Sequence, residues 1–157
     1  MKIIDFLKEE SVLINLQGKT KREALSELLN VLKSKNYIKN SSEILDIVLE
    51  REKLGSTGIG QGIAVPHAKT DQIEKLVGAV GISDNGVSFD SLDGEPVNII
   101  FLILAPTKSI GEHLKALAKI ARLLKNRTFR TALRNSKTAS EAMQIIIEDD
   151  EKLSSTT

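Results

Sequence analysis

Helical hydrophobic periodicity and clear helix-start signals divide the chain into several predicted helices. Residues 20–35 open with Thr20-Lys21-Arg22-Glu23, a capping box, and continue with leucines at helical spacing. A capping residue followed three positions later by glutamate predicts three further helices, starting at Asn40, Ser109 and Thr138. The helix from Ser109 is expected to carry an apolar stripe of Leu114, Leu117, Ala118, Ala121 and Leu124. A short helix is expected at 127–134.

Uninterrupted apolar runs predict strands between these helices. Strands are expected at 12–16, 63–65, 76–83 and 97–104. The last is almost wholly apolar, which is typical of a central strand covered on both faces. Turn residues at 84–86 and 92–96 bracket a small predicted edge strand, Val87 to Phe89.

This order of elements predicts one α/β domain. Helices come early and late and strands lie in the middle, so we expect a mixed β-sheet flanked by helices on both faces. The domain is expected to span residues 1–150. Residues 151–157 are expected to form a disordered tail.

Composition and charge narrow the possible functions. The 22 Lys and Arg residues nearly balance 21 Asp and Glu residues, and aromatics make up 3%, so the chain shows no nucleic-acid footprint. The absence of cysteine excludes disulfides and thiolate chemistry, and two histidines make a metal site improbable, so we expect no metal. The first residues resemble no export signal, and the longest apolar stretch is far below the about 20 residues that span a bilayer. We therefore expect a cytoplasmic protein.

Four glycines in the eight residues 55–62 form the most unusual stretch of the chain. Gly58, Gly60 and Gly62 are candidates for a phosphate loop, because glycine leaves backbone N–H groups free to face an anion. The stretch is not a nucleotide loop, since it runs from a helix into a strand and lacks Gly-Lys-Ser/Thr. A plain connecting loop is an equally good interpretation.

His67 is the candidate nucleophile. It follows Pro66 at the end of a short apolar strand, where its ring should lie at a rim. A neutral imidazole can attack phosphorus and carry a phosphoryl group. From residue type alone, a hydrogen-bonded rim histidine is the more common interpretation.

Three other basic side chains are candidate partners for a phosphoryl group on His67. His113 falls in the first turn of its helix, where the helix dipole disfavours protonation, and it could donate a hydrogen bond to a phosphoryl oxygen. Arg51 and Lys69 are candidate charge partners. Each has a plain alternative, His113 as a border of the apolar stripe and the other two as solvated charges.

A basic run on the late helices is a candidate docking face for an acidic partner, although a solvated face is the more common interpretation. Its members are Lys115, Lys119, Arg122, Lys125, Arg127, Arg130 and Arg134.

Together these residues resemble the type-2 EIIA domains of the bacterial phosphotransferase system, the fructose/mannitol and nitrogen-regulatory group. The signature is Glu52, then Ile59-Gly60, then Ile63-Ala64-Val65-Pro66-His67-Ala68, with no departure from the family pattern. Arg51-Glu52, 56–60, 92–97 and Glu112-His113-Leu114 also look like family blocks. The resemblance covers about residues 3 to 150.

The resemblance implies an EIIA sandwich in which His67 is the phosphoryl acceptor, His113 the second active-site histidine, and Arg51 a neighbour. It implies HPr as donor and an EIIB domain as acceptor, with phosphate ultimately from phosphoenolpyruvate, no cofactor, and a membrane permease reached only indirectly. A regulatory target protein is the alternative partner, as in nitrogen-regulatory members. The blocks from Gly94 to Pro106 and around Glu112 favour the fructose branch, without naming the sugar.

The partner chemistry adds one expectation. EIIB domains of this branch carry phosphate on cysteine, which is absent here, so a separate acceptor is expected and the chain is either free-standing or a piece of a larger protein. A hydrolase with His67 as general base is the weakest alternative, because no nucleophile elbow or metal-ligand cluster supports it.

Overall fold

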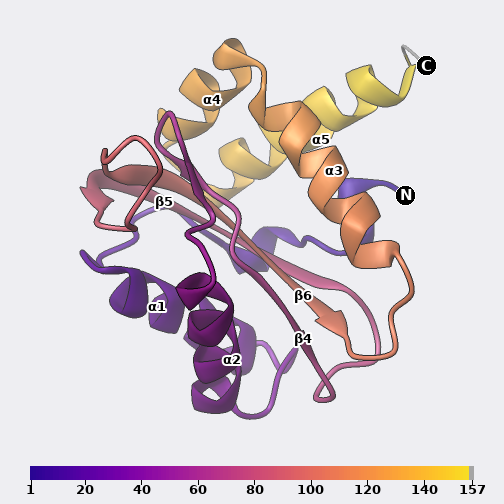
Figure 1. The fold of residues 1–157 in the computed structure, drawn as a ribbon. Helices are drawn as coiled ribbons and strands as arrows, with labels where there is room; N and C mark the ends of the chain where they lie inside the picture. Colours follow the sequence, from indigo (N-terminus) through magenta and orange to yellow (C-terminus); the bar gives the residue numbers. More distant parts are fainter. Residues whose placement is uncertain (156–157) are drawn as a thin grey trace.

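The computed structural model describes residues 1–155 and shows helices packed on a central sheet (Figure 1). The helices are α1 (Lys21–Ser34), α2 (Ser41–Lys53), α3 (Glu112–Leu124), α4 (Arg127–Arg134) and α5 (Ala139–Ser155), preceded by 3-10 turns at Ile3–Asp5 and Glu9–Ser11. The strands are β1 (Val12–Leu13), β2 (Gly58–Gly60), β3 (Ile63–Ala64), β4 (His67–Thr70), β5 (Val77–Val87) and β6 (Val97–Pro106).

The six strands form one mixed sheet around β6. The order is β1-β5-β6-β3-β2, and β4 also pairs with β6, beyond the end of β3. The β1–β5, β3–β6 and β4–β6 pairs are parallel, whereas β5–β6 and β2–β3 are antiparallel. Every residue of β6 from Val97 to Ala105 is buried, as its apolar run predicted.

Helices cover both faces of the sheet, which confirms the predicted fold class (Figure 1). Alternate residues of β6 face opposite cores. Ile100 and Leu102 pack with the leucines of α1 and with α2, and Phe101 and Ile103 pack with α3, α4 and α5. None of the helices in residues 1–155 is long and apolar enough to cross a membrane.

Three of the predicted helix starts are confirmed by side-chain caps. Thr20 and Glu23 form the capping box, the side chain of Asn40 accepts from the Glu43 N–H, and Thr138 accepts from Glu141. The short helix at Arg127–Arg134 also forms as expected.

The predicted start of α3 is wrong by two residues, because the N-cap is Gly111 and not Ser109. The N–H of Ser109 donates to the Pro106 carbonyl in a turn after β6, and the helix is capped by Gly111 at a φ of 85°. His113 is therefore the second helical residue, and the apolar stripe is rotated relative to the prediction. The buried residues of α3 are Ala116, Ile120, Leu123 and Leu124, and Leu114 is 61% exposed.

The predicted turn at 84–86 is wrong, and the predicted separate edge strand at 87–89 forms only in part, as the end of β5 at Val87 and a bridge from Ser88 to Thr20. β5 continues through residues 84–86 and pairs with β6 again at Val87, after a bulge that shifts the register. Gly86 supplies the positive φ of 88° that this bulge needs.

The expected disordered tail is wrong for residues 151–155, which continue α5, while residues 156 and 157 lie outside the described part.

Candidate functional site

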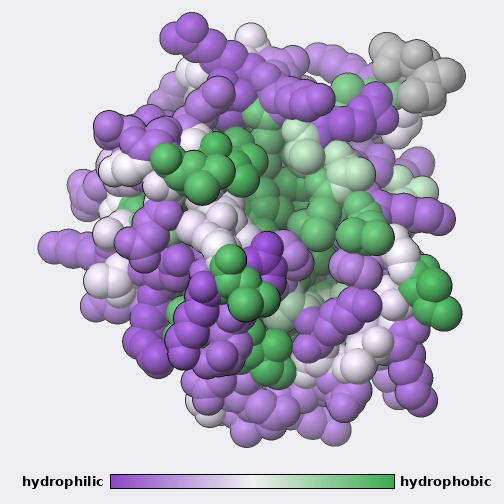
Figure 2. Space-filling model, in the orientation of Figure 1, coloured by the Kyte–Doolittle hydropathy of each residue, from purple (hydrophilic) through white to green (hydrophobic). Residues whose placement is uncertain are grey.

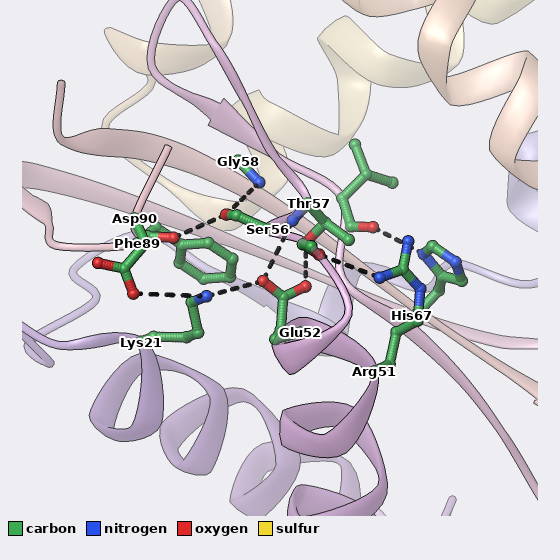
Figure 3. A network of polar contacts seen from close by, with 11 residues as sticks. Lys21, Arg51, Glu52, Ser56, Thr57, Gly58, His67, Phe89 and Asp90 are labelled. Atoms are coloured by element: carbon green, nitrogen blue, oxygen red, sulfur yellow. Dashed lines mark hydrogen bonds and ion pairs between the residues drawn. The ribbon is translucent and has the colours of Figure 1, made fainter. Parts of the chain in front are cut away.

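His67 opens β4, a strand missed by the sequence prediction, and is half-buried. Strand alternation places it on the same side of the sheet as Ile63 and Val65, which belong to the core beneath α3. Its Nδ1 lies 3.0 Å from the Val65 carbonyl oxygen (Figure 3). Because a carbonyl only accepts, this bond requires a proton on Nδ1, which leaves the lone pair of a neutral ring on Nε2.

His113 approaches the same side of the sheet from the first turn of α3. This helix packs on β6, the strand that pairs with β4. Burial, the Lys69 ammonium and His67 lower the pKa of His113 from its ordinary value, so its ring is neutral near pH 7. The two histidines are therefore close enough for charge on one to act on the other. Its Nδ1 is buried and has no hydrogen-bond partner among residues 1–155.

Two cations border these histidines. Lys69 lies two residues after His67 on the same face of β4, and its Nζ is 3.5 Å from the Ser109 carbonyl, just before α3. Arg51, in the last turn of α2, donates to the Gly55 carbonyl at 3.0 Å. Figure 3 shows Arg51 and His67 at the same end of the polar network. Neither cation forms an ion pair within the described residues, so both keep an uncompensated charge.

Glu52 holds the chain segment between α2 and β2 in place. Its buried carboxylate accepts from the Thr57 N–H at 3.1 Å and from the Thr57 hydroxyl, and it pairs with the Lys21 ammonium at 2.9 Å (Figure 3). The Lys21 ammonium also lies 4.9 Å from the centroid of the Phe89 ring.

This network reaches the strand that leads to His67, because the Val65 N–H donates to the Thr57 carbonyl. The sequence prediction used Glu52 only as a family marker and gave it no role. An acid in the last turn of a helix interacts unfavourably with the helix dipole. The position of Glu52 therefore indicates that its carboxylate needs a compensating partner.

The glycines predicted to form a phosphate loop lie elsewhere. Gly60 pairs with Ile63, which is level with Ile99 of β6, whereas His67 is level with Ile103. Four residues of strand correspond to about 13 Å.

Two backbone N–H groups of this stretch are also occupied. The Gln61 N–H donates to the Asp93 carboxylate and the Gly58 N–H to the Ser56 hydroxyl. Gly58, Gly60 and Gly62 therefore build a β-hairpin, and the structure does not bring Gly60 and Gly62 to His67. Their positive φ values of 97° and 78° are those of a tight turn.

The predicted basic run is not one continuous free surface. The Lys119 ammonium pairs with the nearly buried Asp150 carboxylate at 2.6 Å, which ties α3 to α5. Arg130 donates to the Leu124 carbonyl at the end of α3. At least these two members have structural partners.

A mixed sheet between two helical layers carries two histidines and two cations without ion pairs among the described residues. The family model "Phosphoenolpyruvate-dependent sugar phosphotransferase system, EIIA 2" matches residues 5–149. The chain belongs to this family, which confirms the resemblance of its signature.

The similar proteins are named either as nitrogen regulatory proteins or as sugar-specific components of the phosphotransferase system. A nitrogen regulatory protein of Bradyrhizobium diazoefficiens is 38% identical over 93% of this chain and 95% of its own length. The fructose-specific EIIABC component of Bacillus subtilis is 33% identical over 96% of this chain, which spans 24% of that protein. The crystal structure of the nitrogen regulatory protein IIA-Ntr of Neisseria meningitidis superimposes with a TM-score of 0.84 at 30% identity, covering 90% of this chain and 97% of that one. The comparisons do not confirm a preference for the fructose branch.

Proposed function

We propose that the protein carries a phosphoryl group on Nε2 of His67, received from phospho-HPr. The observation that carries this proposal is the Val65 carbonyl, which holds the proton on Nδ1 and leaves the Nε2 lone pair free. The lone pair attacks phosphorus in line as the bond from phosphorus to the donor's histidine nitrogen breaks, and that nitrogen keeps the bonding electrons. The same step run toward an acceptor returns the lone pair to Nε2. The residues present need no metal or cofactor for it.

The surrounding groups suit the charge of the transferred phosphoryl. Neutral His113 carries ring N–H donor capacity without the desolvation cost of a buried cation. Lys69 and Arg51 supply positive charge from either side, and their lack of carboxylate partners leaves that charge for the ligand. Catalysis in such a step is mainly positioning and electrostatics.

A hydrophobic rim beside the histidines supports docking of a partner protein. Ile110 is 97% exposed and Leu114 is 61% exposed, and they flank the first turn of α3 on which His113 lies. Figure 2 shows hydrophobic residues gathered over α3 and the hollowed surface beside it. Exposed apolar clusters of this kind are typical of protein interfaces.

Reconstitution tests the proposal directly. The purified protein is incubated with phosphoenolpyruvate, Enzyme I and HPr, and acid-labile phosphate on the chain is measured. We expect the wild type to be labelled and His67→Ala to remain unlabelled, while His113→Ala accepts the group and passes it on more slowly. An unlabelled wild type, or labelled His67→Ala, would contradict the proposal.

Two destinations for the phosphoryl group follow from the relatives. Delivery to an EIIB domain for fructose- or mannitol-type uptake is supported by the Bacillus subtilis relative, whose name joins A, B and C components. Signalling through the phosphorylation state is supported by the nitrogen regulatory relatives, which match nearly full length. The second destination has the stronger support from these comparisons.

Affinity capture separates the two destinations. If the protein signals, partners captured by the wild type should differ from those captured by a His67→Glu variant, because the added negative charge imitates the phosphorylated ring. His67→Gln is the neutral control. Identical partner sets, together with phosphoryl transfer to a purified EIIB domain, would overturn the signalling role.

A further inference from the structure

A hollow between α4 and the β2–β3 turn has no part in the proposed phosphoryl transfer. It has a volume of about 180 Å³. Its lining includes three arginines of α4, two residues of the β2–β3 turn and one residue of β6: Arg127, Arg130, Arg134, Gln61, Gly62 and Asn98. Gly62 precedes Ile63, which is four strand residues from the level of His67, so the hollow lies about 13 Å away along β6.

Positive charge is concentrated in this hollow. Arg127, Arg130 and Arg134 recur at helical spacing and all line it, so they repel one another. Arg127 is also the first residue of α4, where the helix dipole adds positive potential and the first turn contains no acid. No ion pair within residues 1–155 neutralises any of the three, and the lining holds no carboxylate.

The arginines of the hollow are accessible, since Arg127 and Arg134 are exposed and Arg130 is half-buried. On the opposite side Gly62 has a φ of 78°, and a Cβ there would lie 3.3 Å from the Asn98 side-chain oxygen. The nearby Asp93 carboxylate accepts from the Gln61 N–H on the turn and does not line the hollow. Arg130 donates to the Leu124 carbonyl, a neutral acceptor that leaves its charge in place.

We propose that this hollow binds the diphosphate group of a small phosphorylated metabolite. Guanidinium groups match phosphate oxygens in pairs of parallel hydrogen bonds, and three of them offer more donors than a single phosphate can use. The hollow is smaller than the 300–1,000 Å³, roughly, of sites that enclose a whole ligand. It also lacks an aromatic wall, so it binds the anionic group and leaves the remainder of the ligand outside.

Titration calorimetry with inorganic pyrophosphate tests this site. Arg127→Gln/Arg134→Gln removes two of its charges and spares Arg130, which caps α3. We expect this variant to bind at least about tenfold more weakly than the wild type, because charge-assisted hydrogen bonds are lost. Lys115→Gln/Lys125→Gln removes the same net charge from the same basic run outside the hollow, and should change affinity by less than about twofold.

A second pair of substitutions distinguishes this site from the one at His67. Binding should be retained in His67→Ala/Arg51→Gln, whatever the outcome of the reconstitution assay. The site is refuted if the wild type does not bind pyrophosphate, if the Lys115/Lys125 control loses as much affinity as the arginine variant, or if the His67/Arg51 variant abolishes binding.

Discussion

At the scale of single residues, backbone acceptors and burial decide which histidine atom can react. A histidine on the surface exchanges its proton between both ring nitrogens, but the Val65 carbonyl assigns the proton of His67 to Nδ1. His113 is kept neutral by burial and by the positive charge of Lys69. With its proton on Nδ1, the His67 ring offers a lone pair at Nε2 beside the neutral ring of His113.

The lowered pKa of His113 predicts an acid-sensitive contribution to stability. Below its ordinary value of 6.5, the unfolded chain binds a proton that the folded ring resists, so unfolding becomes easier as pH falls through this window. His113→Asn should reduce the decrease in unfolding free energy between pH 7.5 and 5.5. Urea denaturation of both proteins at the two pH values measures it. An equal decrease in the variant would contradict the cause assigned to the pKa shift.

Arg51 and His67 belong to one local segment of the sequence, whereas His113 comes from a separate block. The structure places both histidines on the same side of the sheet, and their roles stay predictions. The glycine loop was misread, since free N–H groups were assumed where a hairpin and the Asp93 carboxylate occupy them. The hydrogen bond from the Gln61 N–H to Asp93 joins residues more than 30 positions apart, and no local sequence pattern reveals it.

At the scale of elements, local signals were reliable and pairing signals were not. Caps at Thr20, Asn40 and Thr138 form within four residues and were all predicted. β2 and β4 were missed and β5 was cut short, because a strand is defined by its partner. The start at Ser109 failed because Gly111, at a φ of 85°, interrupts the helical backbone between Ser109 and Glu112.

Among the contacts between helices, we expect the ion pair between α3 and α5 to contribute strongly to the free energy of unfolding. The Asp150 carboxylate pairs with Lys119 at 2.6 Å and accepts from the Ile3 N–H at 2.8 Å. Asp150→Ala leaves both groups without this partner and should lower the unfolding free energy by about 3–5 kcal/mol. Chemical denaturation measures the loss. Lys119→Met/Asp150→Leu should recover part of it, because the Lys119 charge is no longer unpaired while the Ile3 N–H still lacks its acceptor. A loss below about 1 kcal/mol in Asp150→Ala would contradict a structural role.

At the scale of the whole molecule, the sheet places the reactive chemistry and the arginine hollow at different levels of one strand. His67 pairs with Ile103 of β6, whereas the hairpin residue Ile63 pairs with Ile99. Helices α3 and α4 pack over this face of the sheet. The mixed fold was predicted correctly because the order of elements is clear and the central strand is almost wholly apolar. The register along β6, which separates the glycines from His67, follows from tertiary pairing and was not predictable.

The central claim is that Nε2 of His67 carries the phosphoryl group. Its most direct test is a two-dimensional ¹H–¹⁵N NMR spectrum of the histidine rings before and after incubation with phosphoenolpyruvate, Enzyme I and HPr. We predict that the Nε2 resonance of His67 shifts on phosphorylation while Nδ1 keeps its proton, and that His113 remains unmodified. A phosphoryl group on Nδ1 of His67, on His113, or on neither ring would contradict the account.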